Sequence, residues 1–222
     1  MISLPEYNHC VQCDLCKTRK NVLIGNGPVR PKVLIIREMP TQLEDKHGTF
    51  MTDDMNFVVR IFEDVVLSKR GRFTRQEARQ VFMEEAFVTS AVSCRGIITA
   101  GANAGNNRDP KTLEIKACRD RLYQVIYQVD PLVILILGHA GAVSLCKRTS
   151  KLPQKVGTAD TLFSVEVPGV LTAVRYPTIY THASDYAERI GDYDDSNGVI
   201  SQICQAFETA WGIADSLLSE KV

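Results

Sequence analysis

Six consecutive apolar residues at 132–137, Leu-Val-Ile-Leu-Ile-Leu, constrain the fold of this chain more than any other segment. A strand that is apolar on both faces is typical of the middle of a parallel sheet, where helices cover both sides. Gly138 ends the run at the point where a loop would leave the sheet. The segment therefore predicts an α/β protein, in which further strands are separated by helices along the chain.

Further strands and helices are predicted to alternate along the chain. Short β-branched runs bounded by glycine and proline indicate strands, and apolar residues that recur every three or four positions indicate helices. Pro168-Gly169 separates two short alternating segments, which predicts a hairpin. The strands are predicted at 32–36, 87–92 and 132–137, with hairpin strands at 163–167 and 171–174, and the helices at 53–68, 110–129, 138–146 and 198–218.

This order of elements predicts a single α/β domain over residues 1–222, with three α/β/α layers and a mostly parallel central sheet. Its N-terminal segment, 1–31, carries a group of cysteines, and its C-terminal segment, 198–222, is mostly the closing helix. Ligands of open parallel sheets bind where loops leave the carboxyl ends of the strands. We therefore expect the functional site at that edge of the sheet.

Charge and hydropathy narrow the choice of partners. The chain has 26 basic and 26 acidic side chains, so its formal net charge gives no argument for nucleic acid, although a local basic stripe would suffice. No apolar run reaches the roughly 18 residues that span a bilayer. The opening residues, Met-Ile-Ser-Leu-Pro-Glu, do not form a secretory signal. We expect an intracellular, cytoplasmic protein with no membrane partner.

Seven cysteines call for an explanation in a chain that is expected in a reducing compartment, where disulfides are rare. Three of them form Cys10-x-x-Cys13-x-x-Cys16, in a polar segment that offers little core to join. Free cysteines do pack as small apolar residues. Three at this spacing in polar surroundings instead favour thiolate ligands of a metal ion or a cluster.

Several short motifs follow one another in a distinctive order between Cys10 and Tyr186. They are Cys10-x-x-Cys13 with Arg19, Gly25-Asn-Gly27, Glu38-Met-Pro40 directly after the first strand, Glu44-Asp45 with Gly48, Cys94-Arg95, Asn107-Arg108-Asp-Pro110 with Glu114 and Cys118, Gly138-x-Ala140, and Thr181-His182-Ala183-Ser184. The ordered set resembles the uracil-DNA glycosylase superfamily, and in particular its iron–sulfur branch, family 4. The resemblance covers most of the chain.

The resemblance implies a 4Fe-4S cluster held by Cys10, Cys13, Cys94 and Cys118. Four thiolates are the usual ligand set of such a cluster, and here two would come from a local loop and two from distant segments. The spacing alone leaves Cys16 as a competing ligand and zinc as an alternative occupant. We expect the cluster to be a structural staple that pins the N-terminus and a glycine-rich loop to the domain.

The resemblance also implies a DNA partner and a base-excising site. The target base leaves the stack and enters a pocket, and the N-glycosidic bond breaks with positive charge growing on the sugar and negative charge on the base. Glu38 would be the carboxylate that stabilises the sugar cation or orients water, and His182 would stabilise the departing base. Ser90, Phe50 and Met51 stand where the family contacts the base.

Four departures from the family pattern all lie in the expected pocket. Arg37 and Thr41 replace glycines, and the bulk of Arg37 would fill the pocket or its charge would meet a phosphate. Ser90 replaces an asparagine, whose bidentate amide contact is worth about 1–3 kcal/mol in base readout. Met51 takes the place of a stacking aromatic unless the register slips by one to Phe50, and the site histidine is followed by alanine rather than proline.

Two functions follow from this distribution of kept and altered residues. One is a glycosylase that excises uracil or a modified base; the other is an inactive, cluster-bearing module that binds DNA, a nucleotide or a protein partner. The retained Glu38 and His182 favour the enzyme, and the altered pocket favours the module. Phosphate contacts are expected from two basic stretches. They are formed by Arg60, Lys69, Arg70, Arg72, Arg75 and Arg79, and by Lys147, Arg148, Lys151 and Lys155.

Overall fold

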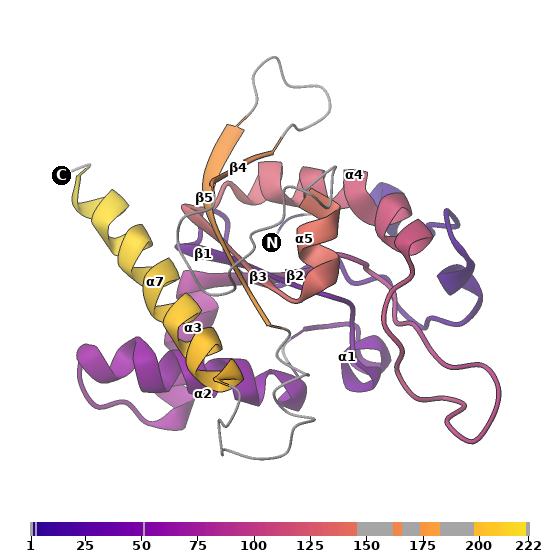
Figure 1. Ribbon diagram of the computed structural model, residues 1–222, viewed down its shortest axis with the longest axis horizontal. Coiled ribbons are helices and arrows are strands. Elements are labelled where there is room, and N and C mark those ends of the chain that lie inside the picture. Colours follow the sequence, from indigo (N-terminus) through magenta and orange to yellow (C-terminus); the bar gives the residue numbers. More distant parts are fainter. Residues whose placement is uncertain are drawn as a thin grey trace.

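The computed structural model describes residues 2, 4–50, 52–145, 162–165, 174–182 and 198–220. Helices and strands alternate along these residues, as Figure 1 shows. The strands are β1 (Val33–Arg37), β2 (Ala86–Ser90), β3 (Val133–Leu137), β4 (Leu162–Val165) and β5 (Val174–Thr181). The α-helices are α1 (Gln42–His47), α2 (Asn56–Val65), α3 (Arg75–Glu85), α4 (Thr112–Val129), α5 (His139–Leu145) and α7 (Val199–Ser219). Short 3₁₀ turns lie at Pro5–Tyr7, Asp14–Lys17, Asp53–Met55 and Leu67–Lys69.

The five strands form one sheet in the order β2-β1-β3-β5-β4. The pairs β1–β2, β1–β3 and β3–β5 are parallel, and β4 adds an antiparallel edge to β5. Parallel neighbours need helical crossovers, which α2, α3 and α4 supply. The predicted α/β fold with a mostly parallel central sheet is confirmed. None of the helices within the described ranges is long and apolar enough to cross a membrane.

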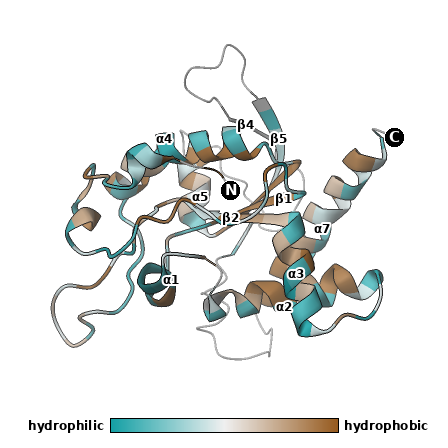
Figure 2. Cartoon of the chain, turned by 180° about the vertical axis from the view of Figure 1, so that it is seen from behind, coloured by the Kyte–Doolittle hydropathy of each residue, from teal (hydrophilic) through white to brown (hydrophobic). Residues whose placement is uncertain are grey.

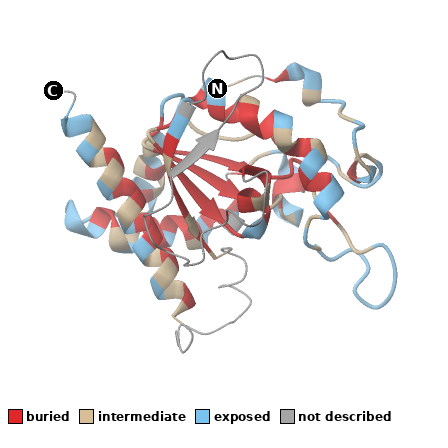
Figure 3. Ribbon diagram, turned by 45° about the horizontal axis from the view of Figure 1, so that its top comes forward, coloured by how far each residue is buried: buried red, intermediate tan, exposed pale blue. Residues whose placement is uncertain are grey.

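Alternate residues of the central strands build two separate cores, one on each face of the sheet. Val33 and Ile35 of β1 join a core with α2, α3 and α7, whereas Leu34 and Ile36 join a second core with α4 and α5. All five residues of β1, β2 and β3 are buried, so these strands appear red throughout in Figure 3. Figure 2 shows apolar residues concentrated on the strands and on the side of α4 that faces them. The uniformly apolar run at 132–137 is explained by this double coverage.

Three elements differ from the expectations. Two unpredicted helices, α1 and α3, begin with capping boxes, Thr41 with Glu44 and Thr74 with Glu77. The strand expected to end near Val174 instead begins there and runs to Thr181. Pro177 lies within this strand and pairs with Leu162 of the antiparallel edge strand. The helix predicted over 53–68 is divided into the 3₁₀ turn Asp53–Met55, α2 and the 3₁₀ turn Leu67–Lys69. The hairpin turn itself lies outside the described residues.

Candidate functional site

Glu38, Gly138 and His182 occupy equivalent positions just past the ends of three neighbouring strands. Ile36 of β1 pairs with Ile136 of β3, and Ile136 pairs with Tyr180 of β5. Glu38, Gly138 and His182 each lie two residues after one of these paired residues. The Gly138 amide still donates a hydrogen bond of 3.0 Å to the carbonyl of the residue before His182. Neighbouring strands lie about 4.8 Å apart, which places the backbones of Glu38 and His182 about 10 Å from each other.

The side chain of Glu38 folds over Gly138 and reaches the start of α5. Its Oε1 accepts a hydrogen bond of 3.2 Å from the backbone amide of Ala140. Gly138 has φ +98°, and a Cβ at this position would lie only 2.6 Å from Cγ and 2.8 Å from Cδ of Glu38. Burial raises the pKa of Tyr180, and the negative charge of nearby Glu38 raises it further. The missing side chain at Gly138 therefore makes room for the carboxylate.

His182 lies half-buried at the end of β5 and faces α7. Its Nε2 is 3.1 Å from Oε1 of Gln202. With the amide oxygen as acceptor, Nε2 carries the proton and Nδ1 is the acceptor of the neutral ring. The long closing helix thus orients the histidine, a contact between residues 20 positions apart.

The predicted base-contacting residues are placed as follows. Ser90 is fully buried at the end of β2, and its hydroxyl donates a 2.8 Å hydrogen bond to the carbonyl of Val92. Phe50 is also fully buried, in the core with α2, and its backbone amide donates to Oδ1 of Asn26 at 2.8 Å. Met51 lies outside the described residues. The hydroxyl of Ser90 and the ring of Phe50 are therefore both engaged inside the protein.

Arg37, the last residue of β1, turns inward and forms a buried ion pair with Glu44 of α1. Its Nη1 is also 3.4 Å from Sδ of Met55, and both charged side chains are almost inaccessible to solvent. A pair of this kind neutralises both charges inside the protein. The charge of the guanidinium is therefore paired with Glu44 inside the protein.

Four of the chain's cysteines line one pocket between the N-terminal segment and α4. Cys10 and Cys13 come from the N-terminal segment, Cys94 from the loop after β2, and Cys118 from α4. Cys16 is not among the lining residues, although it belongs to the same sequence motif. The space between these side chains is partly open to solvent. Segments more than 100 positions apart in the sequence meet here.

The thiols of this pocket lie close enough to influence one another. Burial raises the pKa of Cys94 to about 12, and the positive charge of Arg19, whose Nη1 is 3.7 Å from the sulfur, partly opposes this rise. Burial also raises the pKa of Cys13, with a further rise from the charge of Cys118. Without a bound cation these thiols hold their protons, and a metal would displace them.

Two inorganic groups take a set of four thiolates. A tetrahedral zinc with bonds of about 2.3 Å would bring its sulfurs to within about 4 Å of each other. In the described parts of the chain, no group of three or more His, Cys, Asp or Glu side chains is arranged to hold a metal ion. In a four-iron cluster each thiolate binds a different iron, so the sulfurs stand further apart around a larger body. The four cysteines around one pocket are a donor set that suits either group.

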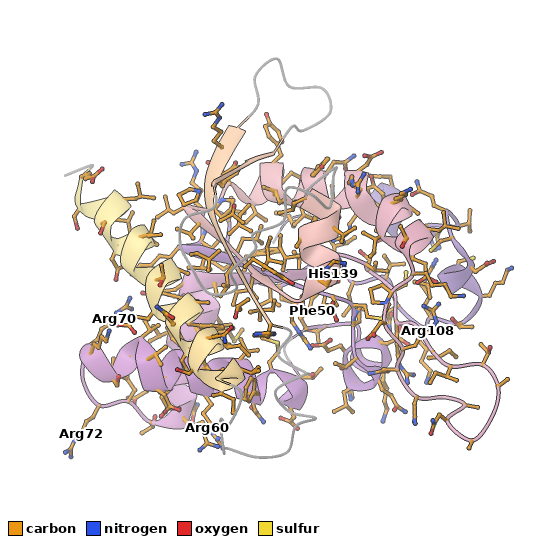
Figure 4. All side chains as sticks on the ribbon, viewed as in Figure 1. Phe50, Arg60, Arg70, Arg72, Arg108 and His139 are labelled. Atoms are coloured by element: carbon orange, nitrogen blue, oxygen red, sulfur yellow. The ribbon has the colours of Figure 1, made fainter. Side chains whose placement is uncertain are left out.

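The first basic stretch is partly engaged in ion pairs. Lys69 pairs with Glu208, and Arg70 pairs with Glu85 at 2.8 Å and with Asp215 at 3.1 Å. Figure 4 shows Arg60, Arg70 and Arg72 spread along the α2–α3 side of the molecule. A role in phosphate binding stays a prediction for this stretch, and the second stretch lies outside the described residues.

Two residues of the site were missed by the sequence analysis. Arg121, a fully buried arginine of α4, lines the cysteine pocket. Its spacing of three from Cys118 places both on one helical face, and that signal was available. Gly138 was interpreted as the end of a strand and as part of the Gly138-x-Ala140 motif, but its contact with Glu38 was not predicted, because it joins residues 100 positions apart.

Comparison with known proteins assigns the family. The family model for the uracil DNA glycosylase superfamily matches residues 24–185. A type-4 uracil-DNA glycosylase of Saccharolobus solfataricus is 28% identical over 153 residues, which are 68% of this chain and 61% of that protein. A type-4 uracil-DNA glycosylase of Pyrobaculum aerophilum is 29% identical over 149 residues, 67% of this chain and 65% of that protein.

The matched region thus spans less than two thirds of the length of these relatives. Among solved structures, a putative uracil DNA glycosylase from Methanosarcina acetivorans superposes with a TM-score of 0.48 and 9% identity, over 86% of this chain and 98% of that one. The family model covers nearly three quarters of the chain. This protein belongs to the uracil DNA glycosylase superfamily.

Proposed function

We propose that this protein binds DNA and excises uracil or a modified base by hydrolysis of the N-glycosidic bond. One observation carries the proposal: Glu38 and His182 stand in register on either side of Gly138, at the carboxyl edge where an α/β sheet binds its ligand. The type-4 uracil-DNA glycosylase relatives support the same reaction.

The chemistry assigns different roles to the two side chains. The bond between the sugar C1′ and the base nitrogen breaks, the bonding electrons leave with the base, and water adds to C1′. The carboxylate of Glu38 stabilises the positive sugar or orients the water, and the ring of His182 faces the negative charge on the base. The products are a free base and an abasic sugar. None of these steps requires a metal.

Cys10, Cys13, Cys94 and Cys118 are proposed to hold a 4Fe-4S cluster. Their convergence on one open pocket supports this assignment over Cys16, which does not line the pocket. The cluster supplies four iron–sulfur bonds that tie the N-terminal segment to α4 and to the loop after β2. Its role is structural, since the pocket and the Glu38 edge are built by different residues.

Substrate recognition is proposed to rest on the altered pocket. Arg37 and Phe50 are buried, and Ser90 has its hydroxyl committed to Val92. A pocket that lacks the family's asparagine reads the base edge less strictly, which favours a modified base over strict selection of uracil. Exposed arginines of the first basic stretch, such as Arg72 and Arg75, are proposed to contact DNA phosphates. Residues 1–222 are proposed to form a single domain.

A non-cleaving module is the second candidate, and the buried pair of Arg37 with Glu44 favours it. Arg37 stands where the family has a glycine, and the buried pair commits its charge to Glu44 rather than to a ligand. Such a module would hold DNA, a nucleotide or a protein partner while the cluster maintains its loops. The two candidates differ in whether an abasic site is formed.

An excision assay separates the candidates. Anaerobically purified protein is incubated with single- and double-stranded oligonucleotides that contain uracil, hypoxanthine or hydroxymethyluracil, and abasic sites are detected by alkaline cleavage. We expect product from at least one base, reduced roughly 100-fold or more in Glu38→Gln. Glu84→Gln, a matched change at an exposed position of α3, should retain activity. Tight DNA binding without an abasic product from any of these bases would contradict the glycosylase and support the non-cleaving module.

A further inference from the structure

Arg121 is a buried cation whose hydrogen-bond acceptors are all neutral. Its side chain is 1% exposed, and its two terminal nitrogens contact the end of β2. Nη2 donates to the carbonyl of Ser90 and, at 3.2 Å, to that of Ala91; Nη1 donates to Oγ1 of Thr89 at 3.0 Å and to the carbonyl of Ile24 at 3.5 Å. The guanidinium therefore fixes the backbone where the strand leaves the sheet.

The partner expected beside such a cation is a carboxylate. Across the described part of the chain, no Asp or Glu forms an ion pair with Arg121, and its Nε has no hydrogen-bond partner. A buried charge without a counter-charge is costly. Arg121 lines the cysteine pocket together with Tyr7, Cys10, Cys94 and Cys118.

We propose that Arg121 is a positioning residue that couples the cluster to the base-binding edge of the sheet. This inference rests on the proposed 4Fe-4S cluster, whose four thiolates bring more negative charge than the iron–sulfide core brings positive charge. That net negative charge compensates the buried guanidinium from one side. The terminal nitrogens then hold Ser90 and Ala91 from the other side.

The contacts continue from β2 to the proposed catalytic residue. The amide of Ala91 donates to the carbonyl of Arg37 at 2.8 Å, and the amide of Val92 donates to the carbonyl of Glu38 at 3.1 Å. A path of direct bonds thus runs from the cysteine pocket through Arg121 to the backbone of Glu38. Removal of the cluster should loosen this edge.

Arg19, the other arginine of the pocket, has a different role. Its Nη2 donates to the carbonyl of Cys10 at 2.6 Å and its Nη1 approaches the sulfur of Cys94. These contacts join one ligand segment to another. Arg121 instead joins the pocket to the three residues at the end of β2.

The test compares Arg121→Met with Arg119→Met. Arg119 lies on the same helix but donates to the carbonyls of Ser144 and Val143, away from the pocket. The iron-loaded proteins are treated with a chelator, and loss of the absorbance near 400 nm is followed. We expect Arg121→Met to lose its iron roughly 10- to 100-fold faster than the wild type, the usual effect of removing a group that supports metal ligands. Arg119→Met should match the wild type.

Hydrogen exchange supplies a readout that does not depend on activity. A peptide covering residues 86–95 should exchange faster in Arg121→Met, and chelator-treated wild type should show the same change. Arg121→Lys keeps the charge but loses the planar fork, so it should keep its iron to within a few fold while this peptide exchanges faster. This variant preserves the test if the methionine variant does not fold.

Two results would overturn the inference, and they are distinguishable. If the wild type binds iron and the Arg121 variants match it in both iron loss and hydrogen exchange, Arg121 has no coupling role and the cluster assignment stands. Wild type that binds no iron under anaerobic reconstitution would remove the cofactor and the coupling together. The excision assay is independent of both.

Discussion

Gly138→Ala tests whether the position of Glu38 depends on a missing side chain. The new Cβ would lie 2.6 Å from Cγ of Glu38, so the glutamate must swing away from the Ala140 amide. A side chain at φ +98° costs about 1–2 kcal/mol of backbone strain, and the lost hydrogen bond costs about 1 kcal/mol. We expect the free energy of unfolding to fall by about 2–3 kcal/mol, which lowers Tm by roughly 4–12 °C for a domain of this size.

The effect on excision should exceed the effect on stability. A catalytic group misplaced by about 1 Å can cost roughly 100-fold in rate, and we expect a loss of that order. Gly105→Ala is the matched control, because its φ is +91° and a Cβ there meets open space. Chemical denaturation and the excision assay on both variants separate backbone strain from the collision with Glu38.

A double-mutant cycle makes the reasoning refutable even if excision is not observed. Glu38→Ala should cost about 1 kcal/mol of stability in the wild type and nothing, or less, in Gly138→Ala, where the hydrogen bond is already lost. Contacting residues are non-additive in this way, whereas independent ones add to within about 0.5 kcal/mol. Additive values would show that Glu38 does not lie over Gly138.

Three further predictions concern other parts of the molecule. Cys94→Ser should abolish the absorbance near 400 nm, whereas Cys16→Ser, outside the pocket, should retain it; loss in both variants alike would reopen the ligand assignment. Arg37→Met should lower the free energy of unfolding by about 3–5 kcal/mol, measured with denaturant, because it leaves Glu44 buried and unpaired. The double variant Arg37→Met/Glu44→Gln should recover much of that loss. A loss below about 1 kcal/mol in Arg37→Met would contradict burial of the pair. Burial, and then the charge of Asp130, raise the pKa of Tyr176 from 10.0 to about 12, so its contribution to stability is complete below pH 10 and is lost as the pH rises towards 12. Tyr176→Phe should lack that part of the alkaline decline in Tm, and an unchanged decline would contradict the shift.

The fold was predictable where one local pattern carries the information. The apolar run at 132–137 became β3, buried on both faces, and the helical stripes became α2 and α4. The helix α1 is only 6 residues long, too short for a periodic apolar pattern, although its capping box was present in the sequence. β5 was missed because polar residues and Pro177 interrupt it, and its place between β3 and β4 compensates for its weak local pattern.

The contacts within the candidate site could not be predicted from the sequence. The resemblance supplied Glu38, His182 and the four cysteines, and the structure brings these cysteines to one pocket. Arg121 was missed because its partners are backbone carbonyls about 30 residues away, which carry no mark in the sequence. The inward turn of Arg37 likewise depends on Glu44 and Met55, whose burial follows from packing of the whole domain.

Iron and acid-labile sulfide per chain, measured on anaerobically purified wild-type protein, test the central claim most directly. Four thiols from three separate segments converge on one pocket, and the account predicts about four irons and four sulfides for each chain. About one zinc per chain, with neither iron nor sulfide, would contradict the account.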